Sequence, residues 1–308
     1  MTEHKQPPTA NSLQEIIEFV ESLNISKQGA WFRGHSDSSF ELIPSVFRKT
    51  GKNGDGPYYN ENELLNEFLR RHPTAKKEHS NTLELLTYAQ HYGLPTRLLD
   101  WSENLLVAIY FACNEFEDKE GELFVWLEQN PKPISTKLFF SSFIDKIIEI
   151  DNKPRLIDGI IDFFKEKTNS GDYIYLNETP IKDLSLNRFL ELSNLDLKQK
   201  LTLSYKVNNQ LTNLDNIHYK FYPPLINKRL ISQGGCFSVH SGKVIDGVIG
   251  LNFSTLKANK SEELVSILIN KDSKQKILKS LKICGIDRAR LFPELEHQTA
   301  VIREQCKY

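Results

Sequence analysis

The 308-residue chain lacks several features by which large classes of proteins are identified. Its four cysteines lie far apart and form no Cys-x-x-Cys pair, so we expect reduced thiols rather than a zinc site or a disulfide framework. No stretch approaches the roughly 18 apolar residues of a membrane-spanning helix. Residues 1–10 are polar and lack the apolar segment of a signal peptide. We therefore expect a cytoplasmic protein with no membrane partner.

An excess of charge of one sign is also absent. The chain has 39 Lys and Arg against 40 Asp and Glu, a formal net charge of −1. This balance argues against a protein that holds nucleic acid mainly by overall charge, although it permits a local basic patch. Hydrophobic residues make up 39% of the chain and charged residues 26%, which is typical of a globular protein with a sizeable core.

Familiar catalytic motifs are missing as well. No Gly-x-Gly-x-x-Gly follows a predicted strand, and Gly51-Lys52 lacks the loop of a nucleotide-binding Walker motif. The chain has neither His-Glu-x-x-His nor Gly-x-Ser-x-Gly. These absences disfavour a classical NAD dehydrogenase, an ATPase, a zinc protease and an α/β-hydrolase, and we expect no metal site.

The most informative segment that is present runs from Gln90 to Ser102 and reads QHYGLPTRLLDWS. Its Gly-x-Pro centre does not suit a helix, so we predict a shaped turn between two helices that presents polar groups at a fixed place. A second segment at 31–35, WFRGH, has the same character, because it is an apolar strand end that stops at Arg-Gly. Together they indicate a built site.

Hydrophobic periodicity predicts the remaining elements. Ser12 and Glu15 match a capping box at the start of a helix. Further helices are expected at 60–71, 82–91 and, with Ser102 as N-cap, after 102, and strands at 30–33, 122–127, 229–239, 244–253 and 263–270. The separated helices and strands favour an α+β class, with a mixed sheet flanked by helices and a mainly helical insertion.

Several motifs together resemble the FRG domain family, which is named for its Phe-Arg-Gly motif. They are Phe32-Arg33-Gly34, Leu42-x-Pro44-Ser45, the run 90–101, Ala108-x-Tyr110-Phe111-Ala112, and, more weakly, Gln233-Gly234-Gly235-x-Phe237 and Leu291-Phe292-Pro293-Glu294-Leu295. The resemblance implies a mainly bacterial and phage domain of poorly established function, and that setting suggests a role in phage defence. We expect an N-terminal helix at 1–25, FRG-like segments at 26–128 and 221–308, and a helical insertion at 129–220.

Arginines and an aspartate are the first candidates for ligand binding. Arg33 next to Gly34 can approach a phosphate or carboxylate bidentately, or it can pair with an acid such as Asp100 to hold the fold. Arg97 can join Arg33 in gripping a pyrophosphate while Asp100 orients one of them, or Arg97 can form a buried pair with Asp100 that only locks the turn.

The remaining candidates come from a helix end and from the second segment. His91 can act as a general acid or base or can donate to a helix C-terminal carbonyl, and Tyr92 can stack on a ligand or pack in the core. Gln233 and its two glycines can bring backbone amides to a ligand or form a bulge. Glu294, with Glu296, can stabilise an oxocarbenium-like state or can be a solvated helix start.

Three hypotheses for function follow. The first is an enzyme that uses NAD as substrate, by ADP-ribosyl transfer to a protein or nucleic-acid acceptor or by hydrolysis, with His91 and Glu294 as catalytic residues. The second is a non-catalytic module that recognises a nucleotide, another phosphate-bearing ligand or a nucleic-acid end, with a protein partner. In the third hypothesis, the cluster of arginine, histidine and aspartate side chains only stabilises the fold. For the first two, we expect Arg33, His91, Arg97, Asp100 and Gln233 to converge.

Overall fold

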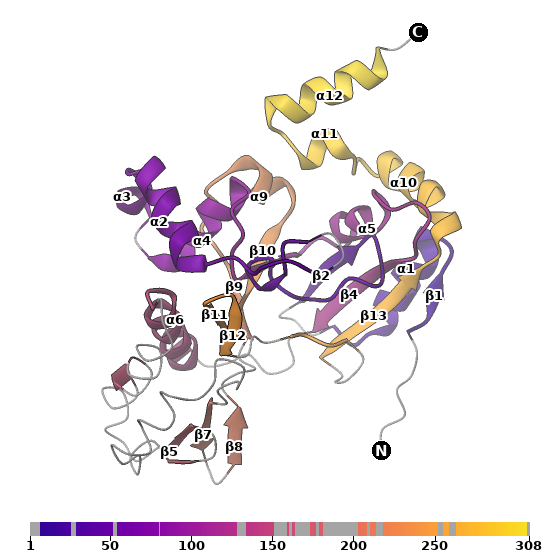
Figure 1. Cartoon of the computed structure of the whole chain (residues 1–308). Coiled ribbons are helices and arrows are strands. Elements are labelled where there is room, and N and C mark those ends of the chain that lie inside the picture. Colours follow the sequence, from indigo (N-terminus) through magenta and orange to yellow (C-terminus); the bar gives the residue numbers. More distant parts are fainter. Residues whose placement is uncertain are drawn as a thin grey trace.

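The computed structural model shows the arrangement of the chain in space (Figure 1). It describes residues 7–25, 29–51, 54–79, 81–127, 134–150, 218–251, 255–258 and 263–306, together with 159, 162–163, 173–176, 179–180, 203–207 and 210–213. Among these residues, no helix combines the length and the apolar character that crossing a membrane requires.

A seven-stranded mixed sheet forms the centre of the described structure. Its order is β1-β13-β4-β2-β3-β10-β9, and only the edge pair β1–β13 is parallel. The strands are β1 (Thr9–Ala10), β2 (Ala30–His35), β3 (Leu98–Ser102), β4 (Gly121–Leu127), β9 (His218–Phe221), β10 (Gly235–His240) and β13 (Leu264–Ile269). The three central strands β4, β2 and β3 thus come from the predicted segment 26–128, and they are flanked by β13 and β10 from the predicted segment 221–308.

Three helices pack against one face of this sheet through a large apolar cluster (Figure 1). They are α1 (Leu13–Ser22), α5 (Leu105–Cys113) and α10 (Lys274–Ile283), the last preceded by the 3-10 turn η4 (Lys271–Ser273). The α1 helix begins as predicted, because Ser12 Oγ accepts from the amide of Glu15, and it buries Ile16 and Val20. The predicted N-terminal helix therefore shares the core of the main sheet.

All three tryptophans of the chain lie in a second apolar cluster that includes residues of β2, β3 and β4. The ring centroids of Trp126 lie 6.1 Å from Trp31 and 5.2 Å from Trp101. The ammonium of buried Lys220 lies 4.9 Å from the ring of Trp31 and 5.0 Å from that of Trp126. The tryptophans and this cation–π contact hold β9 against the centre of the sheet.

The remaining described elements surround this body (Figure 1). Between β2 and β3 lie the 3-10 turn η1 (Ser45–Phe47) and the helices α2 (Glu61–Arg71), α3 (Ala75–Glu78) and α4 (Thr82–His91). Helix α9 (Lys228–Ser232), the hairpin β11 (Lys243–Ile245) and β12 (Val248–Leu251), and the helices α11 (Arg288–Leu291) and α12 (Leu295–Gln305) follow β9. Helix α12 reaches away from the sheet toward the C-terminus.

The structure differs from the sequence expectation in the middle of the chain. Within 129–220, α6 (Ile134–Ile148) is a helix, as expected of this segment, but the described residues also form an antiparallel sheet of order β6-β5-β7-β8, which was not predicted. Its strands are β5 (Tyr173–Leu176), β6 (Thr179–Pro180), β7 (Leu203–Val207) and β8 (Gln210–Asn213). Residues 156–167, for which the helical insertion also predicts a helix, lie almost wholly outside the described residues.

Two local predictions are also corrected. Residues 98–102 are a strand rather than part of a turn, and Asn104 caps α5 in place of Ser102, with its side chain accepting from the amide of Leu106. The predicted strand at 229–239 begins as helix α9 and becomes β10 after Gly234, whose φ of +53° suits a residue without a side chain.

Candidate functional site

A seam in the main sheet creates the candidate site. Among the described residues, β2 and β3 pair at Phe32 and Ser102 alone, whereas β3 pairs with β10 along its length. Beyond Phe32 the two strands no longer share backbone hydrogen bonds. Instead, the guanidinium of Arg33 crosses the gap and its NH1 donates to the backbone oxygen of Asp100 at 2.5 Å. The FRG motif therefore lies where the sheet opens.

A cavity of about 490 Å³ lies at this seam. Strands β2 and β3, helices α5 and α9, the loop after β2 and the segment after α11 all contribute to it. Its lining consists of Phe32, Arg33, Gly34, His35, Ser36, Phe40, Arg48, Asp100, Trp101, Ser102, Val107, Ala108, Phe111, Asn114, Glu115, Arg229, Gln233 and Phe292. The cavity thus combines charged, aromatic and apolar side chains from both FRG-like segments.

Arg33 is held rigidly in this cavity. Its Nε donates to His35 Nε2 at 2.9 Å and its NH1 to the backbone oxygen of Asp100, while a carboxylate oxygen of Asp100 lies 3.9 Å away. The Arg33 side chain is 16% exposed and that of Asp100 is 66% exposed. Burial lowers the pKa of Arg33 to about 10, against the attraction of Asp100, so the group remains a cation at neutral pH.

The imidazole of His35 adopts a single tautomer, and in this form it orients Arg33. Because Nε2 accepts from Arg33, the proton resides on Nδ1, which donates to the backbone oxygen of Phe40 at 3.1 Å. Burial, and then the charge of Arg33, lower the pKa of His35 to about 3. His35 is therefore neutral at physiological pH, which allows it to accept this hydrogen bond.

Two further arginines line the cavity with Arg33. Arg48, just after η1, donates from Nε to the backbone oxygen of Ile43 at 2.8 Å, and its proximity lowers the pKa of Arg33. Arg229 on α9 lies over the ring of Phe292, with its guanidinium carbon 4.8 Å from the centroid. Asp100 and Glu115 are the acidic lining residues. The positive guanidinium groups repel one another, and an anion bound between them would reduce this repulsion. The arrangement therefore favours an anionic ligand.

Gly34 lines the cavity, but helix α5 explains why it is a glycine. A Cβ on Gly34 would lie 2.0 Å from the backbone oxygen of Ala108 and 2.5 Å from the backbone nitrogen of Ala112. The position therefore admits no side chain, because backbone atoms of α5 occupy the space. Gly34, a candidate for ligand binding beside Arg33, therefore lines the cavity, while the space that a side chain would take at this position is filled by α5.

Arg97 is a correction to the predicted site. Its side chain is 0% exposed, and its guanidinium pairs with the buried carboxylate of Glu61 on α2 and donates to the backbone oxygens of His240 and Gly242. All of its contacts are internal, so it does not join Arg33 in binding a ligand. The alternative of a buried ion pair was right in kind, but the partner is Glu61 rather than Asp100.

His91, Tyr92 and Glu294 lie outside the cavity lining. His91 ends α4; burial and then the charge of Arg229 lower its pKa, and the charge of Glu294 opposes that shift. Glu294 Oε2 is buried without a hydrogen-bond partner in the described structure. Tyr92 is 63% exposed, with its ring against Tyr88 and His91. His91, Tyr92 and Glu294 are therefore not part of the cavity, and His91 is related to it only through its electrostatic interaction with the lining residue Arg229.

Gln233 and Asp100 do line the cavity with Arg33, as a site made from two segments requires. Gln233 Nε2 donates to the backbone oxygen of Leu291 at 3.0 Å, so it also ties α9 to α11. Asp100 Oδ1 accepts from Gln90 Nε2 at 2.9 Å, and Gln90 in turn accepts from Thr96 Oγ1. The segment from Gln90 to Ser102 thus supplies one cavity-lining carboxylate and the residues that orient it.

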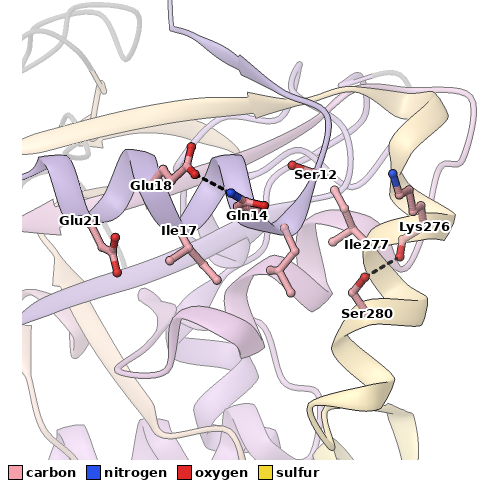
Figure 2. A pocket seen from close by; sticks show the side chains of 9 residues that line it. Ser12, Gln14, Ile17, Glu18, Glu21, Lys276, Ile277 and Ser280 are labelled. Carbon is pink, nitrogen blue, oxygen red and sulfur yellow. Dashed lines mark hydrogen bonds between the residues drawn. The ribbon is translucent and has the colours of Figure 1, made fainter.

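A second hollow of about 580 Å³ lies between α1 and α10 (Figure 2). Its polar side chains are satisfied along their own helices, with Gln14 donating to Glu18 and Ser280 to the backbone oxygen of Lys276. Glu18, Glu21 and Lys276 are exposed. This hollow holds no buried charge, so the cavity at the seam is the better candidate site.

Sequence reasoning missed three residues that shape the cavity. His35 shares a strand face with Arg33 two positions away, so alternation along the strand could have found it. Arg48 and Arg229 reach the cavity only through the tertiary arrangement, and no local signal distinguishes them from other arginines. Among the described residues, no group of three or more His, Cys, Asp or Glu side chains could hold a metal ion.

Comparison with known proteins identifies one part of the chain. Residues 28–121 match the family model of the FRG domain. This range includes β2 with its Phe-Arg-Gly motif, η1, the helices α2 to α5 and β3, whereas the later motifs that resemble the family lie beyond it. No curated protein and no solved structure matches the chain.

Proposed function

We propose that this FRG domain protein binds a phosphate-bearing ligand, of which a nucleotide is the best fit, in the cavity between β2 and β3. The observation that carries the proposal is the convergence of Arg33, Arg48 and Arg229 on one cavity of about 490 Å³. Arg33 is oriented by fixed acceptors through Nε and NH1, and its NH2 has no hydrogen bond within the described structure. The NH2 group of Arg33 can therefore donate a hydrogen bond to a phosphate oxygen.

Direct binding measurements test this proposal. We expect pyrophosphate and AMP to bind in isothermal titration, and Arg48→Ala to weaken binding by about 10-fold or more, since a hydrogen bond to a charged group contributes ~1.5–3 kcal/mol. Arg70→Ala is the matched control, because Arg70 pairs with Glu67 on the surface of α2, away from the cavity. A folded protein that binds neither ligand, or an Arg48 variant that binds as well as the original, contradicts the proposal.

Turnover of NAD is a second candidate, favoured by the electrostatic interaction of His91 with Glu294 and with the cavity-lining Arg229. In hydrolysis, the bond between ribose C1′ and the nicotinamide nitrogen breaks, the nitrogen keeps the electron pair, and a water oxygen bonds to C1′. The lowered pKa of His91 favours the neutral form that accepts the proton of this water. The carboxylate of Glu294 stabilises the positive charge that develops on the ribose. In transfer, a protein or nucleic-acid acceptor replaces the water.

Mass spectrometry separates this enzyme from a binding module. Incubation of NAD with the protein and candidate acceptors is expected to release nicotinamide, and His91→Asn is expected to abolish that release without changing AMP affinity. Saturable binding with NAD recovered intact favours the non-catalytic module instead. The assignment of His91 and Glu294 as catalytic residues fails if His91→Asn turns over NAD at the original rate.

A further inference from the structure

Two exposed phenylalanines stand at the mouth of the cavity. Phe40 belongs to the lining and is 43% exposed, and Phe116, in the loop after α5, is 46% exposed. Their ring centroids lie 5.5 Å apart with the planes at 89°, an edge-to-face pair. We propose that this pair stacks the base of a nucleotide whose phosphate lies on Arg33 and Arg48. This inference rests on the proposed function and specifies the ligand of the same site.

The backbone of Phe116 is held in place by hydrogen bonds and has an uncommon conformation. Its φ is +47°, a left-handed conformation that is uncommon for a bulky residue. The Phe116 backbone oxygen accepts from Lys274 Nζ at 2.9 Å and from the amide of Lys119 at 3.0 Å. Lys274 is fully buried and also donates to the backbone oxygens of Ser36 and Glu115, two cavity-lining residues. One buried lysine therefore holds Phe116 and the cavity wall together.

Phe40 is connected to the guanidinium of Arg33 through His35. Its backbone oxygen accepts from His35 Nδ1, and the opposite nitrogen of the same imidazole accepts from Arg33 Nε. The ring of His35 lies 6.2 Å from that of Phe40. A single neutral histidine thus links the aromatic surface to the guanidinium, so the stacking platform and the phosphate donor are positioned relative to each other before a ligand arrives.

This geometry identifies the class of ligand. Aromatic rings beside the arginines of one cavity suit a base joined to a phosphate, and stacking on phenylalanine accepts any base because every base has a π-face. Since the rings stand at the open mouth, the base remains in contact with solvent. The shared chemistry is a 5′-nucleotide, either free or at the end of a strand.

Titration calorimetry with AMP and with ribose 5-phosphate tests the inference, because the two ligands differ only by the base. We expect AMP to bind about 10-fold more tightly. Phe40→Ala is expected to remove this difference, because it weakens the binding of AMP more than the binding of ribose 5-phosphate. Phe116→Gly is the second variant, because glycine tolerates the positive φ and removes the ring. Leu225→Ala is the matched control, since Leu225 is 65% exposed and does not line the cavity.

The outcomes separate this inference from the proposed function. If neither compound binds the folded protein, the proposed function itself fails. If both bind with equal affinity, or if neither phenylalanine variant changes the ratio, the phosphate site stands and the stacking surface is wrong. If a 5′-phosphorylated tetranucleotide competes with AMP, the site accepts the ends of strands as well as free nucleotides. If the tetranucleotide does not compete, the site accepts free nucleotides alone.

Discussion

Arg97 and Glu61 form an ion pair in the protein interior, with Arg97 Nε donating to Glu61 Oε1 at 2.8 Å across 36 positions of sequence. The same guanidinium donates to backbone oxygens at His240 and Gly242, at the end of β10 and in the turn after it. This single pair therefore joins α2 to the end of β10 and to the turn that follows it.

We expect Arg97→Met to lower the free energy of unfolding by about 3–5 kcal/mol, because it leaves the carboxylate of Glu61 buried without its partner. Urea denaturation followed by circular dichroism measures the change. The double variant Arg97→Met with Glu61→Leu should recover part of the loss, since it removes both buried charges. A single variant as stable as the original protein contradicts the structural role assigned to Arg97.

Acid is expected to destabilise the protein through His35. Its pKa is about 3 in the folded protein and 6.5 in the unfolded chain, so the unfolded state binds more protons between these values. The contribution of His35 is complete above pH 6.5 and is lost as the pH falls toward 3, by up to ~1.4 kcal/mol per pH unit. Comparing urea denaturation at pH 7.5 and 5.5 in the original protein and in His35→Gln isolates this effect. Equal pH dependence in both proteins contradicts it.

Gly34→Ala is expected to destabilise the fold by about 3 kcal/mol, at the upper end of the cost of overpacking, because the new methyl group meets backbone atoms of α5. Thermal unfolding measures the change. Gly247→Ala is the control: no atom lies within 4 Å of the added Cβ, and only the φ of +75° costs about 1–2 kcal/mol. If the two substitutions have the same effect, the close packing of β2 on α5 is not what requires glycine at position 34.

The four thiols should fall into two classes. Cys284 and Cys306 are exposed, whereas Cys113 and Cys236 are buried. Burial raises the pKa of Cys113 to about 12 and also raises that of Cys236, which disfavours the reactive thiolate. A disulfide reagent that reports released thiolate should therefore modify two thiols quickly in the native protein and four in denaturant. Rapid native modification of all four contradicts the burial of Cys113 and Cys236.

Local pattern in the sequence was enough to predict many elements. The helices α1, α2 and α4 follow from caps and apolar periodicity, and β2, β4 and β13 follow from short apolar runs, because each signal lies within the element itself. The α+β class and the resemblance to the FRG domain family were predicted from such patterns and motifs, and the mixed sheet with its helices and the family match at 28–121 confirm them. The choice of Arg33, Asp100 and Gln233 as neighbours came from the motifs that carry them, and they line one cavity.

By itself, the sequence determined which segments could form strands and helices and which residues were chemically capable of binding an anion. Tertiary structure decided how those capabilities were used. It buried Arg97 against Glu61, brought Arg48 and Arg229 to the cavity, and made a strand of 98–102 by pairing it with β10. The physical reason is that partners distant in sequence set the burial, charge and hydrogen bonding of a side chain, and no local periodicity encodes them.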